Sequence, residues 1–179
     1  MKLFRFIIVA LLLIVLFYWK LSANRVQTNT TEEVKSAQTV ISPTIKVAFT
    51  EAKVLRVIDG DTIVLENGKR LRYIGMDAPE THDPKKPVQC FGKEAYKQNK
   101  KLVEGKVIRL EKDVSEADKY GRLLRYVYLG NEMINETLVK DGFAKASNYP
   151  PDDKFKTKLE AAETFAKQNN SGLWNACAR

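Results

Sequence analysis

The stretch from Arg56 to Thr81 constrains the fold most, because it combines a β-hairpin pattern with an acidic cluster at each end. Asn67-Gly68 is a strong two-residue hairpin signal, and β-branched and apolar residues flank it on both sides. Antiparallel pairing across this turn would bring Asp61, at the start of the first strand, near Asp77, beyond the end of the second. The sequence therefore predicts two converging carboxylates.

Converging carboxylates repel each other, and a hard cation that prefers oxygen ligands, such as calcium, relieves that repulsion. A zinc-type cluster is excluded, because the chain has one histidine, His82, and two cysteines far apart. Asp59-Gly60-Asp61 does not begin an EF-hand, since the acidic residue that closes such a loop is missing. A surface hairpin with aspartates in its turns is the simpler alternative for this motif taken alone.

Two arginines extend the pattern. Arg72 lies in the second hairpin strand, and Arg122 ends the segment 118–122 just before another strand candidate. Two fixed guanidinium groups facing a cation and a spare carboxylate suit phosphodiester cleavage, because the charges hold the phosphate and its transition state. Glu80 can then accept a proton from water. We interpret this combination as a catalytic site for phosphoryl chemistry.

The same motifs resemble the thermonuclease family, the staphylococcal or micrococcal nuclease-like enzymes. The resemblance runs from about Lys46 to Trp174 and agrees in spacing as well as identity. The matching segments are Ile58-Asp59-Gly60-Asp61-Thr62, Arg72 followed by Asp77-Ala78-Pro79-Glu80-Thr81, Pro84-Lys85-Lys86, and Asp118-Lys119-Tyr120-Gly121-Arg122.

The resemblance implies roles for individual residues. Asp61 and Asp77 would bind calcium with help from the carbonyl of Ala78. The implied catalytic residues are Arg72, Glu80 and Arg122, and the implied nucleotide contacts are Lys119 and Tyr120. Lys85 and Lys86 could line the phosphate channel, with a solvated charged loop as the alternative. At the family's nucleotide-stacking tyrosine the register puts Asn148, and neighbouring Tyr149 is a candidate substitute.

Five short strands with inserted helices suit an α+β chain built on a five-stranded OB-fold barrel with about three helices. The resemblance implies the same fold. We expect side chains at 135 and at 152 or 153 to cap two of the helices, and the last long helix to bury a stripe at 155, 159, 162 and 165 or 166. The expected strands are 47–56, 62–65, 70–74, 107–111 and 123–129, and the expected helices are 91–104, 135–140 and one from 152 or 153 onward.

Residues 1–23 hold an unbroken apolar run from Phe6 to Trp19 that we expect to be an N-terminal hydrophobic membrane helix. The small-x-small cleavage pattern is poor, so we favour an uncleaved signal-anchor, with a cleaved signal peptide and secretion as the alternative. Lys2 and Arg5 precede the run, which favours an extracytoplasmic domain. Residues 24–44 read as a flexible linker, and 45–179 as the folded domain.

An extracytoplasmic location makes a disulfide between Cys90 and Cys177 the expected state of the two cysteines. Cys90 precedes a helix and Cys177 lies at the C-terminus, so the bond would staple the tail to the body. The alternative is two separate thiols, because sequence spacing alone cannot bring the two Cα atoms within bonding range.

The net charge of +8 favours a polyanionic partner, either nucleic acid or an anionic membrane surface. We expect a monomeric, calcium-dependent endonuclease that acts on DNA and RNA, and the resemblance implies 3′-phosphate products. The alternatives are a catalytically weak nucleic-acid-binding OB-fold module at the cell envelope and an envelope protein that adheres to anionic polymer.

Overall fold

The computed structural model describes residues 49–81 and 87–177. Its longest strand, β1 (Phe49–Asp59), pairs with β5 through its first half and with β2 through its second, and the register shifts where β1 bends. Expected and observed bounds agree for β2, β5 and β6, and β1 runs on to Asp59. The other strands are β2 (Thr62–Leu65), β3 (Arg70–Tyr73), β4 (Met76–Asp77), β5 (Val107–Glu111), β6 (Leu123–Leu129), β7 (Glu132–Met133) and β8 (Lys145–Ala146).

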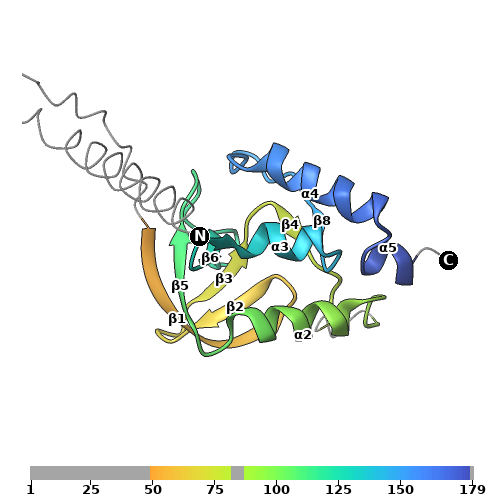
Figure 1. Cartoon of the computed structure of the whole chain (residues 1–179). Coiled ribbons are helices and arrows are strands. Elements are labelled where there is room, and N and C mark those ends of the chain that lie inside the picture. Colours follow the sequence, from red (N-terminus) through yellow and green to blue (C-terminus); the bar gives the residue numbers. More distant parts are fainter. Residues whose placement is uncertain (1–48, 82–86, 178–179) are drawn as a thin grey trace, which may run out of the picture. The chain divides into compact units, whose positions relative to one another are not determined.

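The sheet has the strand order β3-β2-β1-β5-β6-β7 and closes on itself because β3 also pairs with β6. This closing pair is parallel, with Arg72 opposite Leu124, whereas the other strand pairs are antiparallel (Figure 1). The result is a mixed β-barrel of OB-like form built on β1, β2, β3, β5 and β6, as expected from the sequence. Its interior holds fully buried apolar side chains such as Val54, Ile63 and Leu71.

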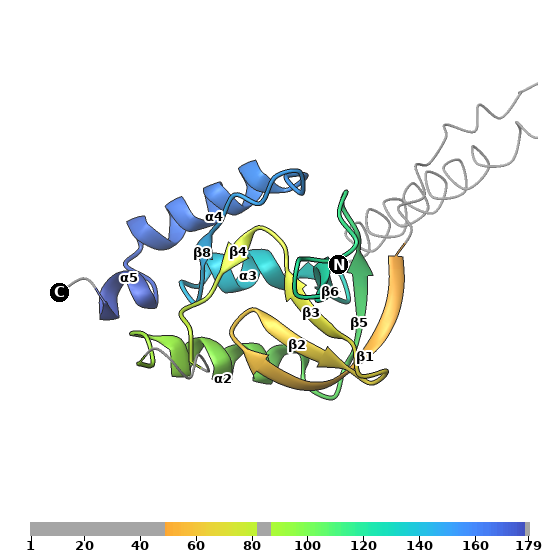
Figure 2. The ribbon, with the colours of Figure 1, turned by 180° about the vertical axis from the view of Figure 1, so that it is seen from behind.

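Helices cover the barrel on two sides. In both views α3 lies between the barrel and α4, and α2 lies on the other side (Figures 1 and 2). These three are the helices expected from the sequence, and a short α5 follows. Their bounds are α2 (Gly92–Val103), α3 (Ile134–Lys140), α4 (Lys156–Gln168) and α5 (Leu173–Ala176).

The side-chain caps predicted for α3 and α4 are wrong, because the side chains of Asn135 and Asp152 bond to other parts of the chain instead. Asn135 lies inside α3 and is fully buried, where its amide accepts from Val127 N–H at 2.8 Å and donates to the Ile74 carbonyl at 2.9 Å. Asp152 lies before α4 and accepts the N–H groups of Val114 and Ser115 at 2.9 and 2.7 Å. Neither helix has a side-chain cap.

The core-facing stripe of α4 is as expected, and the structure decides its last member. Leu159, Ala162 and Ala166 are buried, whereas Phe165 is 46% exposed. Helical spacing makes the alanine a neighbour of the buried pair, and the phenylalanine next to it turns outward. Lys140 lies over the exposed Phe165 ring at 5.1 Å.

Cys90 and Cys177 are joined in a disulfide with an S–S distance of 2.07 Å. The bond connects the segment before α2 to the end of α5, so it ties the C-terminal tail to the body as the sequence suggests. The alternative of two separate thiols therefore does not describe this structure.

Several predictions concern residues outside the described ranges. The apolar segment 1–23, the linker 24–44, both domain boundaries, His82, and the loop lysines Lys85 and Lys86 all lie there. Among the residues that the structure describes, none of the helices has the length and apolarity needed to cross a membrane.

Candidate active site

The β1–β2 turn brings the first carboxylates to the barrel wall. A Cβ at Gly60 would meet the Cβ atoms of Ala78 and Ala95 at 2.5 and 3.0 Å, so only glycine lets the turn pack between the segment that carries Ala78 and helix α2. The flanking side chains of Asp59 and Asp61 are consequently buried, with 6% and 2% of each residue exposed. Buried carboxylates need partners, and each of these has several.

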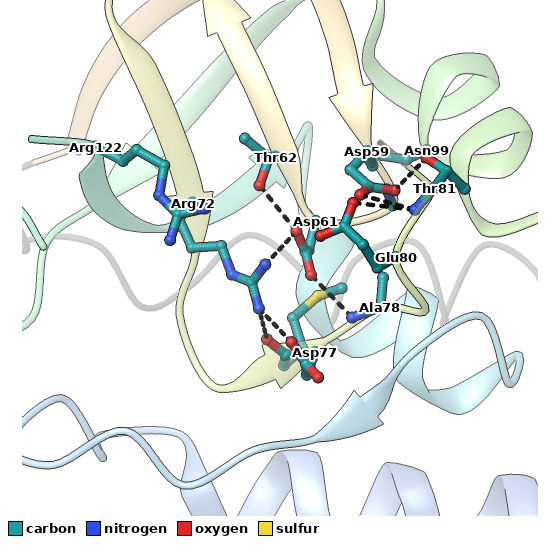
Figure 3. Close-up of polar contacts among 12 residues, drawn as sticks. Asp59, Asp61, Thr62, Arg72, Asp77, Ala78, Glu80, Thr81, Asn99 and Arg122 are labelled. Atoms are coloured by element: carbon teal, nitrogen blue, oxygen red, sulfur yellow. Dashed lines mark hydrogen bonds and ion pairs between the residues drawn. The ribbon is translucent and has the colours of Figure 1, made fainter. Parts of the chain in front are cut away.

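Asp61 is held from three directions. Its Oδ1 accepts the Thr62 hydroxyl at 2.9 Å and pairs with Arg72 Nη1 at 2.5 Å. Its Oδ2 accepts the Ala78 N–H at 2.9 Å. Arg72 then reaches Asp77 Oδ1 through Nη2, also at 2.5 Å, so one guanidinium bridges the two predicted ligand carboxylates (Figure 3). The hairpin does bring Asp61 and Asp77 together, as predicted, although its loop has three residues, 66–68, because Leu65 N–H bonds to the Lys69 carbonyl.

The charges of this cluster depend on one another. Burial raises the pKa of Asp61, while Arg72 and the Ala78 N–H oppose that rise. Burial alone would lower the pKa of Arg72, but Asp61 and Asp77 more than offset it and raise this pKa. Arg72 therefore stays charged, and its removal would leave Asp61 buried without a counter-ion.

Asp59 and Glu80 form a second pair of carboxyl groups, next to the cluster of Asp61, Arg72 and Asp77. Burial, followed by a hydrogen bond with the Glu80 side chain, raises the pKa of Asp59 to about 7. Thr81 lies between them, because its N–H donates to Glu80 Oε1 at 3.0 Å and its hydroxyl donates to Asp59 Oδ1 at 2.8 Å. Figure 3 shows Glu80 and Thr81 against Asp59.

Helix α2 holds the backbone of Asp59 through Asn99. Asn99 is fully buried and donates to the Asp59 carbonyl at 3.0 Å, while the Tyr73 hydroxyl donates to Asn99 Oδ1 at 3.0 Å. The chain from β3 to α2 to the β1–β2 turn therefore fixes the backbone that carries Asp59 and Asp61. Sequence reasoning missed Asn99, since its only signal is an amide among the lysines of an amphipathic helix.

Arg122 is positioned by Asp118, which is four residues earlier in the same motif. Arg122 Nε donates to Asp118 Oδ2 at 2.6 Å, and Asp118 Oδ1 accepts the N–H groups of Tyr120 and Arg122 at 2.9 and 3.0 Å. Burial would raise the pKa of Asp118, but these bonds more than offset it and lower this pKa. The parallel pairing of β3 with β6 brings this turn to the side of the barrel that carries Arg72.

Two of the expected nucleotide contacts, Lys119 and Tyr120, lie in this turn. Tyr120 is 72% exposed, and the charged groups of Lys119 and Arg122 lie 5.1 and 5.6 Å from its ring centre. Asn148 is exposed, whereas Tyr149 is half-buried against a small apolar cluster that includes Ile74. The structure thus offers one exposed aromatic ring beside the arginine.

The oxygen donors around Asp61 and Asp77 suit a hard cation in kind. Across residues 49–81 and 87–177, no three acidic, histidine or cysteine side chains converge as metal ligands. Two carboxylates and the Ala78 carbonyl would therefore have to be completed by water or substrate oxygens, and Arg72 would have to share its carboxylate partners. The donor set fits calcium better than a metal that prefers nitrogen or sulfur.

Comparison with known proteins agrees with this geometry. The sequence profile described as staphylococcal nuclease homologue matches residues 70–176. The thermonuclease of Staphylococcus hyicus is 47% identical over 126 residues, which cover 69% of this chain and 75% of that protein. The chain belongs to the staphylococcal nuclease family.

Other relatives support the assignment. The thermonuclease of Staphylococcus intermedius is 46% identical over 68% of this chain and 74% of its own length. Endonuclease YncB of Bacillus subtilis (strain 168) is 42% identical over 67% of this chain and 59% of its own length. On this similarity the protein is a hydrolase, a thermonuclease-like endonuclease.

Proposed function

We propose that the protein is a calcium-dependent endonuclease that hydrolyses phosphodiester bonds of DNA and RNA and leaves 3′-phosphates. The bridge from Arg72 to both Asp61 and Asp77 is the observation that supports this most. It joins a guanidinium that can hold a phosphate to two carboxylates that can hold a hard cation. A binding-only module has no need for a buried Asp61–Arg72 ion pair that extends to the exposed Asp77.

In this proposal Asp61, Asp77 and the carbonyl of Ala78 hold the cation. When bound, calcium would neutralise charge on the phosphate and polarise its oxygens. Arg72 and Arg122 bind the non-bridging oxygens and stabilise the charge that builds up in the transition state. Lys119 and Tyr120 contact the nucleotide beside Arg122. Tyr120 presents the exposed ring for this purpose.

Glu80 acts as general base. It takes a proton from a water molecule, whose oxygen attacks the phosphorus while the bond to the 5′-oxygen breaks. The 5′-oxygen leaves with a proton from solvent, and the phosphate remains on the 3′-oxygen. The hydrogen bonds from Asp59 and Thr81 orient the Glu80 carboxylate for this step.

We further infer that the domain works outside the cytoplasmic membrane, where a disulfide such as Cys90–Cys177 persists. The apolar segment 1–23 would hold it there as an uncleaved anchor, with Lys85 and Lys86 beside the substrate channel. N-terminal sequencing of the native protein tests the anchor. A mature start near Asn24 in a freely secreted form would refute it.

The test of the main proposal uses the purified domain with closed circular DNA, single-stranded DNA and RNA, each with calcium or with a chelator. Cleavage should require calcium and yield 3′-phosphate ends. Asp77→Asn should raise the calcium concentration needed for half-maximal activity, and the exposed Asp153→Asn should not. Nucleic-acid binding without cleavage in calcium would favour the binding module instead.

A further inference from the structure

Glu80 is held by a residue outside the catalytic motifs. Its N–H donates to Gln89 Oε1 at 3.0 Å, and the Gln89 N–H donates to the Glu80 carbonyl at 3.0 Å. The two bonds lie on either side of the Glu80 Cα, so together they fix the direction in which the side chain leaves the backbone. The side chain of Gln89 and its own main chain both take part.

The segment that carries Gln89 is itself fixed to the body. Gly92 N–H donates to the Gln89 carbonyl at 3.0 Å and closes a turn before α2. A Cβ at Gly92 would lie 3.1 Å from the Glu80 carbonyl oxygen, so the turn packs directly on the backbone of the proposed base. Cys90, between them, is bonded to Cys177.

Both Gln89 and Cys90 are exposed, which makes the covalent bond important. Exposed hydrogen bonds compete with water, so the two bonds to Glu80 cannot by themselves hold a surface segment in one place. A disulfide is not weakened by water, and this one attaches the residue next to Gln89 to α5. Besides the Gly92 turn, the bond between Cys90 and Cys177 therefore holds Gln89 in position.

The carboxylates that face Arg72 are held independently. Asp61 takes its partners from β2, β3 and the Ala78 N–H. Asp77 pairs with Lys145 in the short β4–β8 ladder. A hollow of about 220 Å³ lies between the Asp77–Pro79 segment and the disulfide, and both line it. Release of the disulfide would therefore affect Glu80 before it affects the carboxylates that hold the cation.

We propose that Gln89 is a positioning residue for Glu80, and that the Cys90–Cys177 disulfide holds Gln89 in place so that its reduction lowers kcat. The inference rests on the proposed role of Glu80 as base. A dithiol reductant such as dithiothreitol breaks the S–S bond, is itself oxidised to a cyclic disulfide, and leaves a protonated thiol on each cysteine. The exposed position of Cys90 lets the reductant reach the bond.

The first experiment is a double-mutant cycle of Gln89→Met and Glu80→Gln, with kcat, KM and calcium dependence measured for each. Methionine keeps the length of Gln89 but removes the acceptor, so kcat should fall about 10-fold to 100-fold with KM and calcium dependence unchanged. In the Glu80→Gln background Gln89→Met should have no further effect. Gln89→Glu retains an acceptor and should restore most of kcat.

Asn169→Ala is the matched control, because it removes an exposed side-chain bond, to the Phe165 carbonyl, far from the site in the sequence. It should leave kcat unchanged. The outcomes separate the two claims. Wild-type kcat in Glu80→Gln would overturn the role of Glu80 itself. A loss in Glu80→Gln combined with wild-type kcat in Gln89→Met, or an undiminished Gln89→Met effect in the double variant, would overturn the positioning role.

The second experiment measures kcat before and after reduction by dithiothreitol, at a temperature where circular dichroism shows the reduced protein folded. Reduction should lower wild-type kcat several-fold, and reoxidation should restore it. The Gln89→Met variant should respond much less. Cys90→Ser/Cys177→Ser should match the reduced wild type and ignore the reductant. Unchanged kcat in the reduced, folded wild type would overturn the role of the disulfide.

Discussion

Arg72 and Glu80 lie close together in the chain but are held in opposite ways. Arg72 projects from a barrel strand, its side chain is 17% exposed, and both of its carboxylate partners lie within 2.5 Å. Glu80 lies three residues after Asp77, beyond β4, and is held by bonds to the exposed Gln89 and to Asp59. The guanidinium is thus fixed by the same contacts that stabilise the barrel, whereas the proposed base is fixed by local and covalent attachments. Substitutions of Arg72 and of Glu80 should therefore differ in how they change stability and activity.

The largest effect should come from the base. Glu80→Gln keeps the size of the side chain but removes its basicity, so kcat should fall about 10² to 10⁴-fold. Glu80 is half-buried, but the amide oxygen of the variant can still accept from Thr81 and Asp59, so the free energy of unfolding should change by less than about 1 kcal/mol. Steady-state kinetics at saturating calcium and denaturant unfolding measure the two. The exposed Glu66→Gln is the control, and near-wild-type kcat in Glu80→Gln would contradict the assignment.

Substitution of Arg72 should lower the stability of the fold as well as the activity. Arg72→Ala leaves Asp61 buried without its counter-ion, which should cost about 3 to 5 kcal/mol of unfolding free energy. Arg72→Lys keeps a positive charge but loses the two-pronged guanidinium that can hold two oxygens at once, so it should lower kcat more than it weakens substrate binding. Arg70 is exposed in the same strand, and Arg70→Ala should change neither quantity appreciably. Arg72→Ala with wild-type stability would remove the contrast with Glu80.

The disulfide should contribute to stability separately from its effect on Glu80. It closes a loop with a sequence separation of 87 residues, and such bonds typically stabilise by about 2 to 4 kcal/mol. Cys90→Ser/Cys177→Ser should therefore unfold at lower denaturant concentration with its calcium dependence of activity retained. Reduced wild type should agree with the variant. A large loss of calcium affinity in either would show that the two regions are not independent.

Asp118 should give the smallest and most pH-dependent effect. Its pKa is lowered in the folded state, so its stabilising contribution is present above the unfolded pKa near 3.8 and is lost as the pH falls through the folded value. Asp118→Asn should cost about 1 to 2 kcal/mol at neutral pH, since it weakens a bond to a charged partner. The difference from wild type should shrink below about pH 4. Denaturant unfolding across the acid range measures this, and a difference that grows with acidity would contradict it.

Local signals in the sequence account for much of the fold and for the centre of the site. The Asn67-Gly68 signal locates the hairpin between β2 and β3, and this hairpin brings the two proposed ligand carboxylates together. The expected two-residue turn is wrong, because Leu65 N–H bonds to the Lys69 carbonyl and leaves a three-residue loop, which shifts the register by one residue so that Ile63 lies opposite Leu71. The strand bounds of β2, β5 and β6 follow from short β-branched and apolar runs. These features depend on neighbours in the chain, which is why one sequence suffices to predict them.

Apart from the Cys90–Cys177 disulfide, the contacts between distant segments were not predicted. Asn135 and Asp152 have the right chemistry for helix caps, but each is used to satisfy backbone groups of another element. The Asp59–Glu80 pair and the support from Asn99 likewise depend on how α2 packs on the barrel. The residue type indicates which hydrogen bonds a side chain can make. Only the tertiary structure decides which partner it bonds to.

The parallel pairing of β3 with β6 has a consequence for how the enzyme becomes active during folding. The hairpin that carries Arg72 can form from local contacts, but Arg122 joins it only when the barrel closes across some fifty residues of intervening chain, and such long-range closure is slow. A newly made chain would therefore assemble its acidic pair early and its second arginine late. We expect nuclease activity to recover last in refolding, after the hairpin and the helices have formed. A newly made chain should therefore become active only when its barrel is complete.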